Sequence, residues 1–222
     1  MRAVAALYVR SDSIYKTLPG VDAWDEQRDA RRWPGGVPVV AHPPCRLWAK
    51  LRQFAKAADP QAERAMAVQA VQAVQAYGGV LEHPAESTLW AHCGLPLPGR
   101  SPDRHGGWTA EIRQCDWGHK AEKLTWLYVV GVHPDALPPI PPRSEPVGVI
   151  KPQRGVPRDA RKIVTKAERE ETPRPLAEWL VETARRAWSF APCSLCGYVY
   201  DHDTLGAFGC PNCLGEGLED AA

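Results

Sequence analysis

Four of the seven cysteines form two closely spaced pairs near the end of the chain. Cys193 and Cys196 make the first pair, Cys210 and Cys213 make the second, and 13 residues separate them. Two Cys-x-x-Cys pairs at this spacing can bring four thiolates together around a tetrahedral zinc ion. All four ligand positions are then filled by protein. The sequence therefore predicts a structural zinc ribbon over residues 189–222 rather than a catalytic metal site.

Two disulfide bonds are the alternative arrangement for these cysteines. An odd number of cysteines and an N-terminus without a secretory signal argue against an oxidising compartment, so zinc is favoured and a cytoplasmic location is expected. From residue 201 to residue 222 the sequence carries five acidic residues and no lysine or arginine. An acidic segment is a poor ligand for phosphate, so the ribbon is expected either to hold the C-terminus together or to contact a protein partner.

A single cysteine and a carboxylate each follow a predicted strand. Cys45 comes shortly after the apolar segment 37–41, and Glu82 directly follows the short apolar segment 80–81. Between them, residues 60–77 have a helical composition, a capping Asp-Pro start and a Gly-Gly end. Such a strand–helix–strand unit predicts two parallel strands whose carboxyl ends lie at one edge of a sheet. We therefore expect Cys45 and Glu82 to face the same crevice.

Cys45 is the candidate nucleophile of this crevice. Pro43 and Pro44 stiffen the turn that presents its thiol, because each proline ring fixes one backbone angle. Arg46 follows directly, and a neighbouring cation favours the reactive thiolate form. A buried structural cysteine is the alternative interpretation. Glu82 can likewise serve only to cap backbone donors or to pair with an arginine.

Three short motifs, taken in their order along the chain, resemble the cytosine-5 DNA methyltransferases. Pro44-Cys45 resembles the Pro-Cys nucleophile that follows a strand in this family, and Glu82-His83-Pro84 resembles its Glu-Asn-Val or Glu-Asn-Pro strand end. The segment Gln114–Lys123 (QCDWGHKAEK) resembles the Gln-x-Arg-x-Arg segment that enters a later strand. Residues 172–180 are similar to the C-terminal helix of compact, phage-type members. The resemblance extends over roughly residues 37–185.

This resemblance implies chemistry at C5 of a cytosine that has been rotated out of the DNA double helix. Cys45 would add to C6 of the base, and Glu82 would contact N3 and the exocyclic amine. Lys123 stands where the family has an arginine, and Gln114 stands where it has its glutamine. The methyl donor would be S-adenosylmethionine and the partner would be DNA. The candidate DNA-binding residues are Arg46, Arg158, Arg161 and Lys162.

Two features of the family have no counterpart in this sequence. The Phe-x-Gly-x-Gly loop that holds the methyl donor is missing from residues 6–20, and the closing Gly-Asn-Ser motif is missing as well. Only 44 residues precede Cys45, so the cofactor half of the fold is expected to be truncated. Asp12 and Asp25 are the candidate cofactor-binding residues. The alternative function is that of a catalytically altered relative, a zinc-ribbon module that binds DNA or protein.

Other chemistries fit these residues less well. A zinc deaminase needs His-x-Glu, whereas His83 and Glu86 lie one residue too far apart. A second metal site is a further alternative, with imidazole and thiolate ligands from His42, Cys45, His83 and His119. The segment 143–174 holds nine basic and five acidic residues, so it is either a DNA-binding stretch or a solvated face with ion pairs.

The elements that must position these residues belong to an α/β domain. The 222 residues are 44% hydrophobic and 24% charged, with a formal net charge of +1, so a folded chain is expected and DNA binding must use a local patch. No apolar run reaches the roughly 18 residues of a membrane span. Further strands are predicted at residues 3–9 and 124–132, and an amphipathic helix at 173–188. Together they predict an α/β domain with a parallel sheet over residues 1–188, and the resemblance implies that this sheet is Rossmann-like and of the methyltransferase type.

Overall fold

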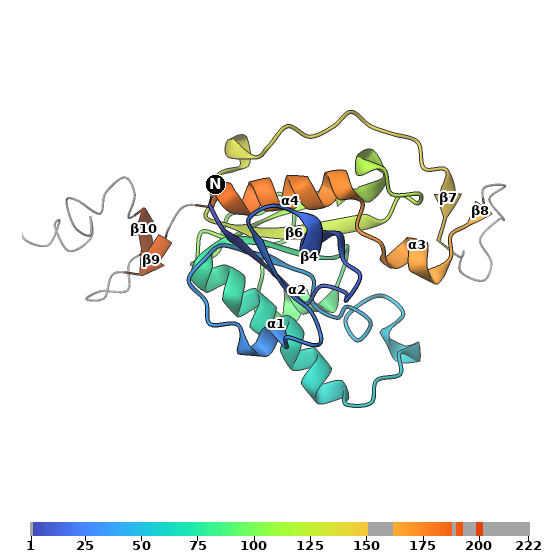
Figure 1. Cartoon of the computed structure of the whole chain (residues 1–222), viewed down its shortest axis with the longest axis horizontal. Helices are drawn as coiled ribbons and strands as arrows, with labels where there is room; N and C mark the ends of the chain where they lie inside the picture. Colours follow the sequence, from blue (N-terminus) through green and yellow to red (C-terminus); the bar gives the residue numbers. More distant parts are fainter. Residues whose placement is uncertain (1, 151–161, 188–189, 193–198, 202–222) are drawn as a thin grey trace, which may run out of the picture.

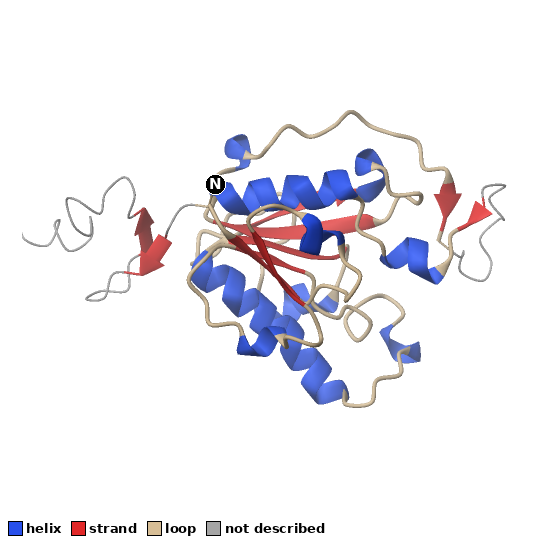
Figure 2. Cartoon of the chain, in the orientation of Figure 1, coloured by secondary structure: helices blue, strands red, loops and turns tan. Residues whose placement is uncertain are grey.

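A six-stranded sheet with helices on both faces forms the centre of the molecule (Figures 1 and 2). The computed structural model describes residues 2–150, 162–187, 190–192 and 199–201. The strand order is β2-β1-β3-β4-β6-β5. The strands are β1 (Val4–Leu7), β2 (Val21–Trp24), β3 (Val39–Ala41), β4 (Gly79–Pro84), β5 (Trp108–Arg113) and β6 (Leu124–Val130).

Five of these strands run in one direction, and β6 runs antiparallel to both of its neighbours. The chain thus has a mixed α/β fold with a mostly parallel sheet, compatible with a Rossmann-like fold. The predicted parallel sheet is confirmed in part, since β6 departs from it: a short connection from β5 brings the chain back beside β4 in the opposite direction. The strand order reverses at β1, and in such sheets ligands bind beyond the carboxyl ends of the strands at the reversal.

The predicted strand–helix–strand unit is confirmed. Helix α1 (Pro60–Tyr77) joins β3 to β4, which pair in parallel with Val39 opposite Gly79. The Asp59 carboxylate accepts a hydrogen bond from the first turn of the helix, and Gly78, with φ of +72°, ends the helix. A side chain at Gly79 would place its Cβ 2.0 Å from the carbonyl oxygen of Val39. Glycine at this position therefore lets β4 approach β3.

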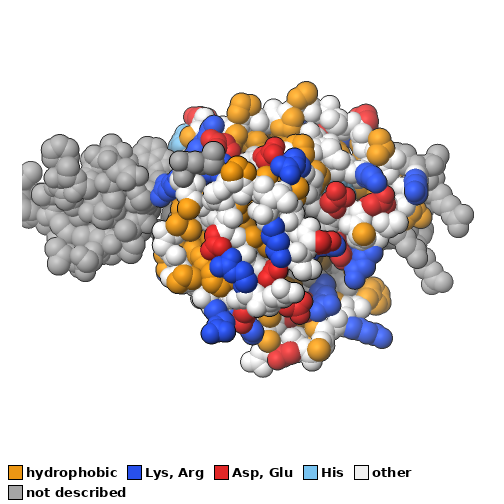
Figure 3. Space-filling model, in the orientation of Figure 1, with side chains coloured by type: hydrophobic (Ala, Val, Ile, Leu, Met, Phe, Trp, Pro, Cys, Tyr) orange, Lys and Arg blue, Asp and Glu red, His pale blue; other side chains and the backbone are white. Residues whose placement is uncertain are grey.

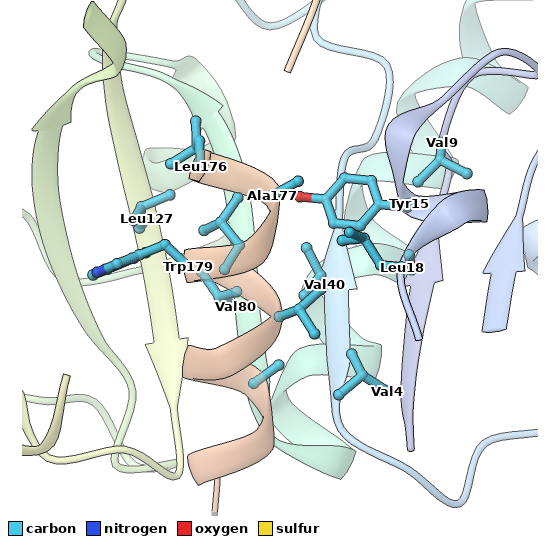
Figure 4. Packing of buried hydrophobic residues seen from close by; sticks show 14 of the residues in the cluster. Val4, Val9, Tyr15, Leu18, Val40, Val80, Leu127, Leu176, Ala177 and Trp179 are labelled. Atoms are coloured by element: carbon cyan, nitrogen blue, oxygen red, sulfur yellow. The ribbon is translucent and has the colours of Figure 1, made fainter. Parts of the chain in front are cut away.

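Helices α1 and α2 (Thr88–Cys93) cover one face of the sheet, and α4 (Arg174–Arg186) covers the other. On the α4 side, Val40, Val80 and Leu127 of the sheet pack with Leu176 and Ala177 of the helix (Figure 4). Tyr15 belongs to the same buried cluster. The amphipathic helix predicted from residue 173 is thus confirmed, and its apolar face closes the core beneath the candidate site.

The remaining elements are short. The 3-10 helices are η1 (Ile14–Thr17), η2 (Ala30–Arg32), η3 (Arg52–Phe54), η4 (Gln114–Trp117) and η5 (Pro134–Ala136). The others are β7 (Gly148–Val149), β8 (Lys162–Ile163), α3 (Lys166–Glu170), β9 (Phe190–Pro192) and β10 (Val199–Asp201). Strands β9 and β10 pair antiparallel.

The four cysteines of the predicted zinc ribbon lie outside the described residues. The ribbon, its zinc ion and the domain boundary at residues 188–189 therefore stay predictions. Among the described helices, none is both long enough and apolar enough to cross a membrane.

Candidate active site at the ends of β3 and β4

Cys45 lies in a tight turn just beyond the carboxyl end of β3. Its backbone carbonyl accepts hydrogen bonds from the amides of Trp48 and Ala49, both at 2.9 Å, and these bonds fix the turn. Glu82 lies near the carboxyl end of the adjacent parallel strand β4. The thiol is partly buried, and the Glu82 charge acts on it. The structure therefore brings these two residues to the same edge of the sheet.

The environment of Cys45 favours the neutral thiol. Burial raises the pKa of the thiol, the Glu82 carboxylate raises it further, and the charge of Lys123 opposes both. The Arg46 guanidinium forms a forked ion pair with Glu63, so it is not the unpaired cation beside the thiol that the sequence suggests. Lys123 also acts on the sulfur, and its charge favours the thiolate.

Glu82 is held from two sides. One carboxylate oxygen accepts a hydrogen bond from Gln114 Nε2 at 2.7 Å, and the other contacts His42 Nδ1 at 3.1 Å. Burial acts to raise the pKa of Glu82, but the charge of Lys123 and the contact with His42 outweigh it and lower the pKa to about 2. Because an ionised carboxylate only accepts hydrogen bonds, the amide nitrogen of Gln114 and the Nδ1–H of His42 must both face it.

Gln114 and Lys123 come from the segment that enters β6. Gln114 opens η4, is 1% exposed, and also donates a hydrogen bond to Thr125 Oγ1 at 3.0 Å. Lys123 directly precedes β6 with φ of +41°, a left-handed conformation that is unusual for a side chain of this size. Its carbonyl oxygen accepts hydrogen bonds from the Gln114 amide and the Thr125 hydroxyl. This short loop thus places Gln114 and the lysine charge beside Glu82.

Sequence reasoning missed part of this site. His42 was considered only as a metal ligand and Tyr15 was not considered, yet the Tyr15 hydroxyl lies 2.8 Å from His42 Nε2. The position of His42 directly after β3 could have indicated that it lies near Glu82. Tyr15 precedes His42 by 27 residues, and no local pattern indicates that the two side chains meet. The proposed second metal site is not found, since no group of three metal-binding side chains occurs in the described part of the chain.

The side chain of His83 faces away from this group. Neighbouring residues of a strand point to opposite faces, so Glu82 faces His42, whereas the His83 ring lies 6.2 Å from the Trp90 ring on the α2 side. Burial lowers the pKa of His83 to about 4, although the Glu82 charge opposes the shift. His83 is therefore a neutral core residue at pH 7.

This burial predicts a specific loss of stability in mild acid. In the unfolded chain His83 has a pKa near 6.5 and takes up a proton as the pH falls below that value. In the folded protein its pKa is about 4, so it stays neutral until the pH is much lower. Lowering the pH from 7 to 5 should therefore decrease the free energy of unfolding by about 2 kcal/mol through His83. Urea unfolding at the two pH values measures this, and His83→Asn should remove most of the difference. His133→Asn, which replaces a side chain that is 70% exposed, is the control. An unchanged pH dependence in His83→Asn would contradict the assignment.

The two candidate cofactor-binding residues, Asp12 and Asp25, do not fit the S-adenosylmethionine that the resemblance implies. Asp25 directly follows β2, where a carboxylate can bind a ribose, but it is 3% exposed. One of its oxygens binds Lys16 Nζ at 2.5 Å, and the other accepts the amides of Gln27 and Arg28. The hydrogen bond from Lys16 is the main reason that the pKa of Asp25 is lowered. This carboxylate is therefore fully engaged by the protein.

The other candidate cofactor residue is no better placed. The Asp12 side chain is 67% exposed and forms a double hydrogen bond with Arg10. The turn after β1 is made by Tyr8, with φ of +59°, where the family has glycines. A large side chain at this turn denies the close backbone approach that glycine allows a nucleotide.

The candidate DNA-binding residues are scattered or engaged. Arg46 is paired with Glu63, and Lys162 is exposed in β8. Arg158 and Arg161 lie outside the described residues, so the basic stretch stays a prediction. On the face shown in Figure 3, basic and acidic side chains are interspersed rather than gathered into a single patch.

Comparison with known proteins adds no assignment to this geometry. The chain matches no protein-family model, no curated protein and no solved structure.

Proposed function

We propose that this protein is a DNA (cytosine-5) methyltransferase-like enzyme in which the Cys45 thiol adds to C6 of a flipped cytosine. One observation supports this most strongly. A partly buried thiol, an ionised carboxylate, a lysine charge and a carboxamide from three separate segments meet at one edge of the sheet. Those segments hold the three motifs on which the resemblance to the family depends.

The reaction can be written with protein groups alone as far as the covalent adduct. The sulfur forms a bond to C6, and the C5–C6 double bond shifts to C4–C5 as N3 gains the proton that the thiol loses. Glu82 stabilises the new N3–H and the adjacent amine, while Lys123 favours the thiolate during the attack. The adduct is an enamine that is nucleophilic at C5. It can take up a solvent proton at C5, lose the original hydrogen and expel the sulfur again.

The same geometry supports a preference for cytosine. A carboxylate has about four acceptor directions, and Gln114 and His42 use two of them. The remaining two suit the side-by-side N–H donors at N3 and the exocyclic amine of an N3-protonated cytosine. Uracil and thymine present an oxygen at C4, which an ionised Glu82 would repel.

The test is exchange of the C5 hydrogen, which needs the adduct but no methyl donor. Duplex and single-stranded DNA of varied sequence, tritiated at cytosine C5, is incubated with the reduced protein, and tritium released to water is counted. We expect release above the protein-free rate without S-adenosylmethionine. DNA binding is measured in parallel by fluorescence anisotropy at a fixed salt concentration.

Methyl transfer is tested separately. In 5-fluorocytosine DNA, C5 carries fluorine in place of hydrogen. After an electrophile adds to C5, no proton can leave from that carbon, so the sulfur is not expelled. The covalent adduct then survives denaturing electrophoresis. A trapped adduct that requires S-adenosylmethionine would establish methyl transfer. Exchange without such trapping would mean that C5 receives another electrophile.

A DNA-binding or protein-interaction module is the second candidate function. The raised pKa of Cys45 and the engaged carboxylate of Asp25 favour it, because both weaken the case for catalysis. DNA binding without any tritium release would exclude the enzyme and leave the module.

A further inference from the structure

A buried chain of hydrogen bonds leads from the core to Glu82. The Tyr15 hydroxyl lies 2.8 Å from His42 Nε2, and His42 Nδ1 lies 3.1 Å from the Glu82 carboxylate. Tyr15 is 1% exposed, and the side chains of His42 and Glu82 are 13% and 12% exposed. Three elements contribute one residue each, namely η1, the end of β3, and β4.

The direction of these hydrogen bonds follows from the ionised carboxylate. Glu82 can only accept, so His42 carries a proton on Nδ1. In the neutral ring, Nε2 has no proton and accepts a hydrogen bond from the Tyr15 hydroxyl. Burial and the Glu82 charge raise the pKa of Tyr15 well above its usual value, so the hydroxyl keeps its proton. In this single arrangement, the polar side-chain atoms of Tyr15, His42 and Glu82 that form these two hydrogen bonds each have a partner.

The series of hydrogen bonds from Glu82 through His42 ends at Tyr15, in the core and not at the surface. Tyr15 packs with Val40 and Ala177 in the cluster beneath α4 (Figure 4). A path that stops in an apolar cluster cannot carry protons to bulk water. Its effect must therefore be on the orientation and tautomer of the groups at its other end.

Building on the proposed function, we propose that Tyr15 and His42 are positioning residues that hold the Glu82 carboxylate in the one orientation that accepts cytosine. Tyr15 fixes the tautomer and the ring plane of His42, and His42 fixes the rotation of the carboxylate. Gln114 holds the opposite oxygen. With both oxygens held, the two free acceptor directions are fixed in space before the base arrives, which removes a reorganisation step.

The substitutions that test this differ in which ring nitrogen they replace. Asparagine places its amide nitrogen near the position of Nδ1, so His42→Asn keeps a donor to Glu82 and loses the link to Tyr15. Glutamine reaches the position of Nε2, so His42→Gln keeps the link to Tyr15 and loses the donor to Glu82. Tyr15→Phe keeps the ring in the core and removes only the hydroxyl. Urea unfolding verifies that each variant is folded.

Two measurements, the rate of tritium release from cytosine and the ratio of this rate to the rate for uracil, distinguish a positioning role from a general loss of activity. Tritium release is measured at saturating DNA for cytosine and for uracil at the same site. We expect His42→Gln to lower the cytosine rate about 100-fold, and His42→Asn and Tyr15→Phe to lower it about 10-fold, with DNA affinity unchanged. The ratio of the cytosine rate to the uracil rate should fall in all three, because a freed carboxylate can turn to accommodate O4. Tyr15→Phe should add nothing to His42→Asn, since the link is already lost.

Equal losses on cytosine and uracil, or His42→Asn being as poor as His42→Gln, would overturn the proposal. A separate measurement applies if the wild-type protein releases no tritium, which would count against the proposed function itself. The ¹⁵N shifts of His42 report its tautomer directly. Protonation on Nδ1 in the wild type, lost or mixed in Tyr15→Phe, would support the positioning role, and an Nε2–H tautomer would refute it.

Discussion

Replacing Cys45 by serine is expected to abolish tritium release from cytosine C5, with a loss of about 1,000-fold or more. The sulfur is the proposed nucleophile, and a serine hydroxyl at the same place is far less nucleophilic at neutral pH. The turn that presents residue 45 is fixed by backbone hydrogen bonds from Trp48 and Ala49, so the substitution should leave it intact. Release is counted at saturating DNA, with affinity measured by anisotropy.

Two other described cysteines provide matched controls. Cys93 is half-buried at the end of α2, and Cys115 is 3% exposed within η4. The Glu82 charge raises the pKa of the Cys45 thiol but is not among the causes of the raised pKa of Cys93 or Cys115, so Cys93→Ser and Cys115→Ser should retain the wild-type rate. Retention of activity in Cys45→Ser, or its loss in Cys93→Ser, would show that the nucleophile has been assigned to the wrong residue.

Replacing Glu82 by glutamine is expected to slow tritium release about 100-fold while changing DNA affinity little. The charge of Glu82 matters most once N3 carries a proton, so the loss should appear in the rate at saturating DNA. Glutamine also offers only one oxygen, so Gln114 and His42 can no longer both donate to the side chain. One of these two donors then faces the new amide.

This second effect makes a stability control necessary. Urea unfolding of Glu82→Gln separates loss of the fold from loss of the rate. Glu111→Gln is the matched variant, since Glu111 on β5 is an exposed carboxylate that accepts a hydrogen bond from Trp126 Nε1. It should release tritium at the wild-type rate. A Glu82→Gln protein that is folded, binds DNA and exchanges normally would remove the carboxylate from the proposed mechanism.

The sequence by itself determined the part of the site that depends on local signals. The Asp59 cap, the Gly78 stop and the apolar segments on either side specify β3, α1 and β4 within a short stretch of chain. The helix carries the chain back to the starting end of the sheet, so the two strands run parallel and their carboxyl ends lie at the same edge. Cys45 and Glu82 could therefore be placed at one edge without knowledge of any distant residue. Gln114 and Lys123 were placed there only by their resemblance to a family motif.

The two edge strands of the sheet, β2 and β5, could not be predicted from the local sequence pattern. Strand β2 has a single buried residue, Ala23, and β5 lies at the opposite edge, so neither carries the apolar run of a central strand. The direction of β6 depends on its pairing with β4 and β5 and not on its own composition. Pairings between segments far apart in the chain decide these features, and a single sequence does not display them.

Tertiary structure alone decided the electrostatics of the site. Arg46 is next to Cys45 in the sequence, but its guanidinium is paired with Glu63, and Lys123, 78 residues after Cys45, also acts on the sulfur. Tyr15 joins the site only because η1 packs against α4 beneath β3. A side chain interacts with its neighbours in space, and long-range packing chooses those neighbours. The sequence thus determined which groups could do chemistry, and the fold determined which of them meet.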